Sequence, residues 1–314
     1  MIAQLLALTL GTSYDPMRVP DVAVKSVDQT WRDSDRRRDV PVRIYLPAES
    51  DHRPVLFFSH GLGGSRENNR YLGEHLARRG FVVIFLQHPG SDEGVWKDVP
   101  MRQRMRAMQS AASTANLRLR VDDVHFAIDE LVRRSTSDGT LKGRVKLSQV
   151  GMFGHSFGAA TTQAVSGQSF PLVGTSWTDA RIRASVMYSP NAARDGRGRS
   201  SEFESVKVPW LLMTGTLDDS PIGRSDAADR LKVFPGLPKG NKYECVLNEA
   251  THMAFGEREL TQGSPRNANH HRVILALTTA FFEAHVSNSS DALKWLQGSG
   301  PRSVMEPKDT WRKK

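Results

Sequence analysis

The sequence predicts an α/β fold in which helices cover both faces of a mostly parallel sheet. Short apolar runs rich in Val, Ile and Phe alternate along the chain with helical patterns. Most of these runs are apolar throughout, as expected for strands buried on both faces. The chain has 314 residues, of which 39% are hydrophobic, and this is enough for a sizeable core. With no internal repeat or low-complexity linker, we expect one domain over residues 1–314.

Each element is expected from its own pattern. Residues 22–24 and 40–46 are predicted to form an opening antiparallel pair around a charged turn region at 33–39. Residues 69–79 place Tyr71, Leu72 and Leu76 on one face, which predicts an amphipathic helix that ends at Gly80. Further strands are expected at 55–59, 81–86, 150–153, 182–188, 208–214 and 242–247, and further helices at 117–134, 159–164 and 273–285. Residues 298–314 are expected to form a loosely packed tail.

Composition narrows the functional classes. The formal net charge is +9, from 43 Lys and Arg against 34 Asp and Glu. The basic residues are scattered without aromatic interleaving or a helix-turn-helix pattern, so we expect a solvated basic surface and no nucleic-acid partner. No stretch reaches the roughly 18 to 20 apolar residues that a membrane span needs. Attraction to anionic surfaces or substrates stays open.

Two features bear on the compartment. The apolar residues 1–10 have no positive residue before them, so the sequence gives little support for a signal peptide. The single cysteine, Cys245, excludes an intrachain disulfide and favours a cytoplasmic location over export, although many exported bacterial proteins also lack disulfides.

The strongest motif surrounds Ser156, which lies between Gly154 and Gly158 where an apolar strand stops and a helix of small residues begins. So tight a turn needs glycine at both positions, because side chains there would collide with neighbouring backbone. The turn exposes the hydroxyl and places the N–H of Phe157 at a helix N-terminus, aimed at developing negative charge. This pattern is typical of a nucleophile elbow; the alternative is a glycine-rich turn that merely contains a serine.

A serine nucleophile needs a base, and the base needs an orienting carboxylate. Asp218 follows the predicted strand at 208–214 and the turn glycine Gly215, at the edge where α/β sheets hold their sites. Asp219 competes with it, and a helix cap or loop role is the alternative for Asp218. His252 follows the last strand in a loop of small and polar residues, which makes it the predicted base.

A second glycine-rich loop follows the predicted strand at 55–59 and includes Gly61, Gly63 and Gly64. We expect the backbone N–H groups of Leu62 and Phe157 to form an oxyanion hole, with the histidine before the loop, His60, bracing it. A phosphate-binding loop is the alternative, but no Lys-Ser or Lys-Thr follows and the G-x-G-x-x-G spacing is absent. We see no metal-ligand cluster and expect neither a metal nor a cofactor.

Residues 92–116 contain three methionines, Met101, Met105 and Met108, at helical spacing with arginines between them. One interpretation is an amphipathic helix that packs its methionines on the core. The other is a flexible cover over the acyl pocket, because the segment follows a predicted strand near the site.

Several of these segments resemble known families. Residues 58–66, 72–83 and 154–158 resemble predicted dienelactone-hydrolase-type proteins and platelet-activating-factor acetylhydrolases, and residues 88–92 and 120–123 fit the former group. The chain departs from both families. Platelet-activating-factor acetylhydrolases carry their acid after the strand that follows the elbow helix, where this chain has no carboxylate at the turn, residues 189–191. Asp218 is placed as in bacterial lipases, cutinases and polyester hydrolases. Dienelactone hydrolases proper use a cysteine where this chain has Ser156.

The resemblance implies an α/β-hydrolase fold, no cofactor, and hydrolysis of carboxylic esters, often of short or activated acyl groups, through an acyl-enzyme. A small molecule, a lipid or a polymer would supply the ester. The alternatives are a phospholipid or platelet-activating-factor-type acyl hydrolase or a thioesterase with the same triad, and a catalytically silent binding protein on the same fold. The sequence does not predict the oligomeric state.

Overall fold

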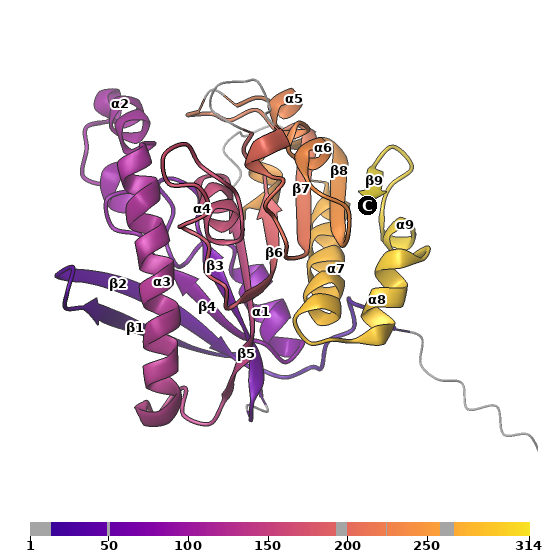
Figure 1. Ribbon diagram of the computed structural model, residues 1–314, viewed down its shortest axis with the longest axis horizontal. Helices are drawn as coiled ribbons and strands as arrows, with labels where there is room; N and C mark the ends of the chain where they lie inside the picture. Colours follow the sequence, from indigo (N-terminus) through magenta and orange to yellow (C-terminus); the bar gives the residue numbers. More distant parts are fainter. Residues whose placement is uncertain (1–13, 49–50, 193–199, 224, 258–266) are drawn as a thin grey trace, which may run out of the picture.

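One nine-stranded sheet organises the chain (Figure 1). The computed structural model describes residues 14–48, 51–192, 200–223, 225–257 and 267–314, so residues 1–10, considered above as a signal peptide, lie outside it. The strands are β1 (Lys25–Asp33), β2 (Arg38–Leu46), β3 (Arg53–Ser59), β4 (Val82–Leu86), β5 (Val145–His155), β6 (Ile182–Tyr188), β7 (Trp210–Leu217), β8 (Lys242–Thr251) and β9 (Thr310–Lys313).

The middle of the sheet is parallel and both edges are antiparallel. The strand order is β1-β2-β4-β3-β5-β6-β7-β8-β9. Strands β4, β3, β5, β6, β7 and β8 pair in parallel, whereas β1–β2, β2–β4 and β8–β9 pair antiparallel. The predicted fold class is therefore confirmed: a mostly parallel sheet with helices on both faces.

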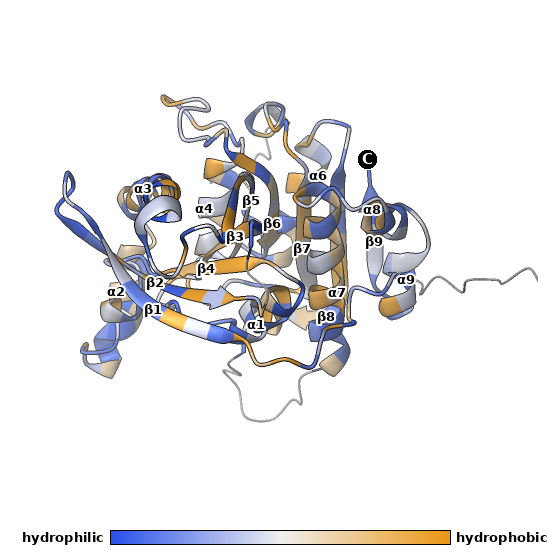
Figure 2. Ribbon diagram, turned by 90° about the horizontal axis from the view of Figure 1, so that it is seen from below, coloured by the Kyte–Doolittle hydropathy of each residue, from blue (hydrophilic) through white to orange (hydrophobic). Residues whose placement is uncertain are grey.

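Helices connect the strands and cover the sheet. The α-helices are α1 (Arg70–Arg78), α2 (Met101–Ala111), α3 (Thr114–Ser137), α4 (Phe157–Val165), α5 (Ala227–Arg230), α6 (Val233–Gly236), α7 (Ala268–His285), α8 (Ser290–Gln297) and α9 (Gly300–Val304), and the 3-10 helices are η1 (Glu93–Val95), η2 (Ser200–Glu202) and η3 (His252–Phe255). Helices α1 and α7 pack on one face, and α3 and α4 pack on the other (Figure 2). The apolar strands lie between these two layers, which is why their side chains are hydrophobic in both directions.

Most predicted elements agree with the structure to within a few residues. The strand expected at 182–188 is β6 itself, and the helix expected at 69–79 is α1, followed by Gly80 at a φ of 95°. The opening pair forms, but its first strand is β1 and not residues 22–24.

The expectation of a loosely packed tail is wrong. Residues 298–314 include α9 and β9, and β9 extends the sheet by pairing with β8 from Val246–Thr310 to Tyr243–Lys313. The ring of Trp311 stacks on that of Tyr243 with their centroids 5.6 Å apart. The tail therefore covers an edge strand that would otherwise expose unpaired backbone groups.

The topology brings the predicted site residues to one edge of the sheet. The loop after β3 begins at His60, Ser156 follows β5, Asp218 follows β7, and His252 follows β8. All four strands are parallel, so their carboxyl ends meet at the same edge. Separately, none of the helices in the described part of the chain is long and apolar enough to cross a membrane.

Stability is expected to fall in mild acid because packing in the fold lowers the pKa of several histidines. Burial lowers the pKa of His75, His88, His155 and His285 from 6.5 to about 4, 4, 3 and 4. Such a histidine takes up a proton on unfolding, so its contribution is complete above pH 6.5 and is lost as the pH falls toward the folded-state pKa. As the pH falls from about 6.5 to about 4, each of these histidines is expected to lower the free energy of unfolding by up to about 3 kcal/mol.

Urea unfolding across this pH window measures the effect. The His75→Gln variant should show a shallower decline than the parent chain, because glutamine does not titrate. A free energy of unfolding that stays constant down to a pH of about 4 would contradict the expectation.

Candidate active site

The turn at Ser156 is strained in the way the sequence predicts. Ser156 has φ 56° and ψ −113°, a backbone conformation that residues other than glycine rarely adopt. A Cβ on Gly158 would lie 1.9 Å from the carbonyl oxygen of Ser59, and one on Gly154 would lie 2.3 Å from the carbonyl oxygen of Gly158. Both glycines are therefore required, and the expectation of collisions at these two positions is confirmed. The Ser156 N–H donates to the Tyr188 carbonyl at 2.9 Å, which fixes the turn to β6.

His252 and Asp218 are in direct contact. Nδ1 of His252 lies 2.7 Å from Oδ1 of Asp218, and both residues are buried. The second carboxylate oxygen accepts a hydrogen bond from the Thr214 hydroxyl at 2.7 Å. Burial raises the pKa of Asp218, but the hydrogen bond with His252 and the charge of Arg230 outweigh burial, and the net pKa is lowered. The carboxylate is thus ionised at neutral pH and can only accept the hydrogen bond, so the neutral imidazole carries its proton on Nδ1 and its lone pair on Nε2.

The structure separates the two competing aspartates. Asp219 is exposed, and its carboxylate accepts the backbone N–H of Ala227 at 3.0 Å. Asp218 meets His252 because β7 and β8 approach closely where the strands end. A Cβ on Gly215 would lie 2.0 Å from the carbonyl oxygen of Ala250, so only glycine permits this approach.

A buried arginine on α5 supports the pair, and the sequence analysis missed it. Arg230 is 1% exposed; its Nε donates to the Asp218 carbonyl at 2.7 Å and lies 3.0 Å from the carboxylate. Its Nη1 donates to the carbonyls of Ser189 and Pro190 at 2.9 and 3.1 Å. Arg230 therefore ties the loop after β6 to the loop after β7. No local pattern distinguishes it from the other arginines of the chain.

Two further side chains link the serine turn to its surroundings. His155 Nε2 donates to the carbonyl of His252 at 3.1 Å, and the two rings lie 4.7 Å apart. Burial and the neighbouring His252 lower the pKa of His155 to about 3, so this ring is neutral. Asn191 Nδ2 donates to the carbonyl of Ser156 at 3.0 Å. These contacts hold the serine turn and the histidine loop in a fixed relation.

The glycine loop after β3 lies against the serine. A Cβ on Gly61 would stand 3.6 Å from the Cβ of Ser156, so the backbone that leads to Leu62 passes beside the serine side chain. His60 is fully buried, its Nδ1 donates to the Gly61 carbonyl at 2.6 Å, and its Nε2 accepts the N–H of His88 at 3.1 Å. Both ring nitrogens are thereby engaged, in agreement with a bracing role for His60.

The segment at 92–116 contacts this loop but does not pack its methionines as expected. Trp96 Nε1 donates to the Gly63 carbonyl at 2.7 Å, and the Met108 side chain packs against Gly63. Met101 and Met105 are 81% and 51% exposed. The expectation that the methionines pack on the core is therefore wrong for these two residues, and α2 reaches the molecule mainly through its C-terminal end.

The arrangement at this edge contains titratable groups but no metal-binding geometry. In the ranges that the structure describes, no three His, Cys, Asp or Glu side chains are grouped so that they could hold a metal ion.

Parts of the chain are similar to known proteins. Residues 42–136 match the model of the family described as platelet-activating factor acetylhydrolase, isoform II. The chain is 24% identical over 213 residues to cutinase 1 of Thermobifida cellulosilytica, covering 67% of this chain and 64% of the relative. It is also 24% identical to a cutinase of Thermobifida fusca, a match that covers 67% of this chain and 56% of the relative. The identity to the platelet-activating factor acetylhydrolase of Cavia porcellus is 24%, over 48% of this chain and 38% of the relative.

The matched region thus spans less than two thirds of the length of these relatives. The family match includes the glycine loop at Gly61–Gly64 and ends before the turn at Ser156. Together with the order of the strands and the helices that connect them, these similarities identify the chain as having the α/β-hydrolase fold.

Replacing Gly158 by alanine should destabilise the fold. The added methyl group would overlap the Ser59 carbonyl, and relieving this overlap must move either the serine turn or the end of β3. We expect a loss of about 3 kcal/mol in the free energy of unfolding, measured by urea or thermal unfolding. Gly139→Ala is the matched control, because no atom lies within 4 Å of its added Cβ, and it should change stability by less than about 0.5 kcal/mol. Equal stability of the two variants would contradict this account of the turn.

Proposed function

We propose that the protein is a carboxylic ester hydrolase that uses Ser156 as nucleophile, His252 as base and Asp218 as the orienting acid. The observation that carries the proposal is the 2.7 Å contact between His252 Nδ1 and the buried Asp218 carboxylate, at the same sheet edge as the strained serine. Serine attack on an ester needs this order of groups. The similarity to proteins named cutinase and platelet-activating factor acetylhydrolase supports the same reaction class.

The mechanism follows from the charge state of each group. Nε2 of His252 takes the proton of Ser156 as Oγ forms a bond to the ester carbonyl carbon. The carbonyl oxygen becomes anionic and accepts hydrogen bonds from the N–H groups of Leu62 and Phe157. His252 then gives its proton to the alcohol oxygen as the C–O bond breaks. A water molecule, deprotonated by His252, releases the acid from the acyl-enzyme.

The segment at 92–116 is proposed as a cover beside this site. Trp96, near its start, and Met108, in its second half, both contact Gly63 in the glycine loop. Met101 and Met105 leave an apolar strip exposed on the same segment. An acyl chain or an ester surface next to the loop would meet these side chains.

The family match favours one second candidate, an ester of a phospholipid as the substrate. Initial rates on nitrophenyl esters of graded chain length, on a phospholipid with a short second acyl chain and on an acyl thioester would separate the candidates. Turnover of the phospholipid ester above all nitrophenyl esters would favour the acetylhydrolase-type reaction.

Labelling by a fluorophosphonate tests the nucleophile. The reagent bonds only to an activated hydroxyl, so the parent chain should be labelled and Ser156→Ala should not. The variant should also lose ester turnover by about 10⁶-fold in kcat. A folded parent chain that is not labelled would favour the catalytically silent binding protein instead.

The two neighbouring aspartates provide a matched pair for the acid. Asp218→Asn should lower kcat by about 10⁴-fold, because an amide no longer holds the imidazole in the required tautomer. Asp219→Asn should leave kcat unchanged, because the Asp219 side chain caps a backbone N–H away from His252. Steady-state kinetics on a nitrophenyl ester measure both. Equal losses in the two variants would exclude Asp218 as the specific partner of His252.

A further inference from the structure

A buried arginine on α3 contacts both sides of the proposed oxyanion hole. Arg120 is fully buried. Its Nη1 donates to the carbonyl of His60 at 2.6 Å, in the loop that leads to Leu62. Its guanidinium carbon lies 4.5 Å from the centroid of the Phe157 ring, in the residue whose N–H is the second proposed donor. One planar cation thus touches the residues that carry or precede both donors.

The same guanidinium also fixes the loop after β4. Nε of Arg120 donates to the Ser91 hydroxyl at 2.8 Å, and Nη2 donates to the Ser91 carbonyl at 3.2 Å. The Ser91 carbonyl in turn accepts the N–H of Gly63 at 2.9 Å. Arg120 and Gly63 therefore share an acceptor, and the arginine anchors the glycine loop from two directions.

Arg120 retains its positive charge without a carboxylate in contact. Within the described ranges its hydrogen bonds go to the carbonyls of His60 and Ser91 and to the hydroxyls of Ser59 and Ser91, and Asp123 and Asp92 act on it only at longer range. Burial lowers its pKa to about 9, so the group remains protonated at neutral pH. A buried cation of this kind is costly in folding free energy, and such groups cluster where a charge develops during a reaction.

The carboxylate of Asp123, on the same helix as Arg120, binds other side chains instead of Arg120. It lies 2.7 Å from Arg38 Nε, 2.9 Å from Arg36 Nη1 and 3.0 Å from His88 Nδ1. Nε2 of His88 is 2.9 Å from the Ser59 hydroxyl. Ser59, His88 and Asp123 thus repeat the order of a serine triad, but all three are fully buried, so no substrate reaches them. Their contacts hold the end of β3 in place.

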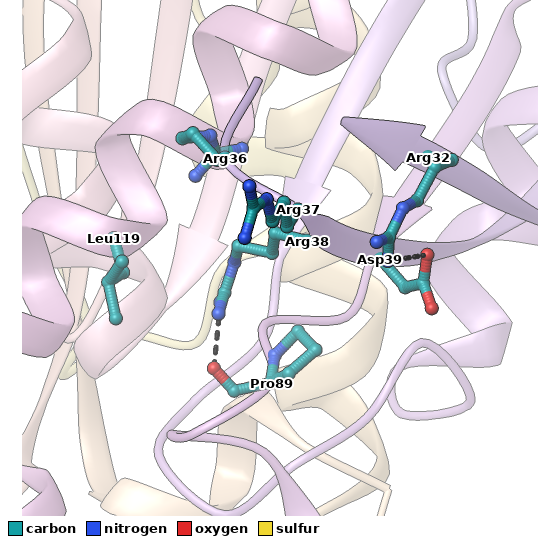
Figure 3. A pocket seen from close by; sticks show the side chains of 7 residues that line it. All are labelled: Arg32, Arg36, Arg37, Arg38, Asp39, Pro89 and Leu119. Atoms are coloured by element: carbon teal, nitrogen blue, oxygen red, sulfur yellow. Dashed lines mark hydrogen bonds and ion pairs between the residues drawn. The ribbon is translucent and has the colours of Figure 1, made fainter. Parts of the chain in front are cut away.

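The outer end of this network opens to the surface. Figure 3 shows a depression lined by Arg32, Arg36, Arg37, Arg38 and Asp39, with Pro89 and Leu119 beside them. Arg38 Nη2 donates to the Pro89 carbonyl at 2.7 Å, and Arg32 pairs with Asp39 at 2.9 Å. Carboxylates thus bind three of these arginines: Arg32 pairs with Asp39, and Arg36 and Arg38 pair with Asp123. The depression lies where this network of ion pairs reaches the surface.

We propose that Arg120 is the positioning residue of the oxyanion hole: it holds the Leu62 loop against the Phe157 turn and places a buried positive charge next to the residues that carry or precede the two proposed donors. This inference rests on the proposed ester hydrolysis at Ser156. The ester carbonyl is neutral in the bound substrate and anionic only in the transition state. Loss of Arg120 should consequently lower kcat and leave KM nearly unchanged.

Two substitutions separate geometry from charge. Arg120→Met removes both the charge and the fork of donors, and should lower kcat by about 10²- to 10³-fold, comparable with the loss of an oxyanion donor. Arg120→Lys keeps the charge, but one ammonium group cannot span His60 and Ser91, so a loss of roughly tenfold is expected. Arg118→Met is the control: Arg118 lies on the same helix, is 57% exposed in its side chain, and should keep kcat and KM at parental values.

A trifluoromethyl ketone provides a readout that a purely structural role would not change. Ser156 Oγ adds to the ketone carbon, the hydroxyl proton passes to His252, and the ketone oxygen becomes anionic in the proposed hole. The inhibition constant for this ketone should rise in the Arg120 variants by about the factor by which kcat/KM falls. The inhibition constant for the neutral product alcohol should stay at its parental value.

The outcomes are distinguishable. The inference is overturned if Arg120→Met folds and keeps the parental kcat, or if its kcat falls while its affinity for the ketone is unchanged. In either case, ester turnover by the parent chain would still support the proposed hydrolysis. A parent chain without ester turnover and without fluorophosphonate labelling overturns both proposals. If Arg120→Met does not fold, Arg120→Lys decides: a loss in kcat with unchanged KM and weaker ketone binding supports the inference, and parental values overturn it.

Discussion

The site depends on one close backbone contact, that between Gly158 and the carbonyl of Ser59. Only a residue without a side chain can lie there, because a Cβ would stand 1.9 Å from the oxygen. Strand β3 continues from Ser59 into the glycine loop, so the contact fixes the serine turn and the loop to the same point. Gly215 against the Ala250 carbonyl repeats the arrangement where β7 meets β8, and it allows Asp218 to reach His252. Steric exclusion of side chains at these positions sets the geometry of the reacting groups.

The contacts join distant segments, but the glycine turns and buried strands that make them have local sequence patterns, and for this reason the sequence predicts these elements. A buried strand is recognisable from its continuous apolar run, and β4 begins within one residue of the strand expected at 81–86 and ends with it. The glycines around Ser156 reveal the tight turn, and chain order selects His252 among ten histidines. The choice of Asp218 before Asp219 rested on its being first after the turn glycine. The contact with His252 agrees with that choice for a different reason, which is the close approach of β7 and β8.

What the sequence does not reveal are features that depend on distant parts of the chain. Arg120 and Arg230 resemble the other scattered arginines, because a charge count carries no information on burial. Many of their acceptors are backbone carbonyls, which every segment offers, so these contacts leave no mark in the sequence. Strand β9 was missed for a related reason: its four residues are mostly polar, and only pairing with β8 makes them a strand. Hydrogen bonding between distant segments leaves no local periodicity.

The two buried arginines play corresponding parts on the two sides of the serine. Arg120 binds carbonyls in the loops after β3 and β4, and Arg230 binds carbonyls in the loops after β6 and β7. A guanidinium presents five donors in a fixed plane, so it can hold two loops at a set distance where a lysine could not. The loop after β6 supplies the carbonyls of Ser189 and Pro190 to Arg230, and its Asn191 binds the carbonyl of Ser156. With the proposed acid Asp218 placed after β7, the loop after β6 thus serves to support the serine turn.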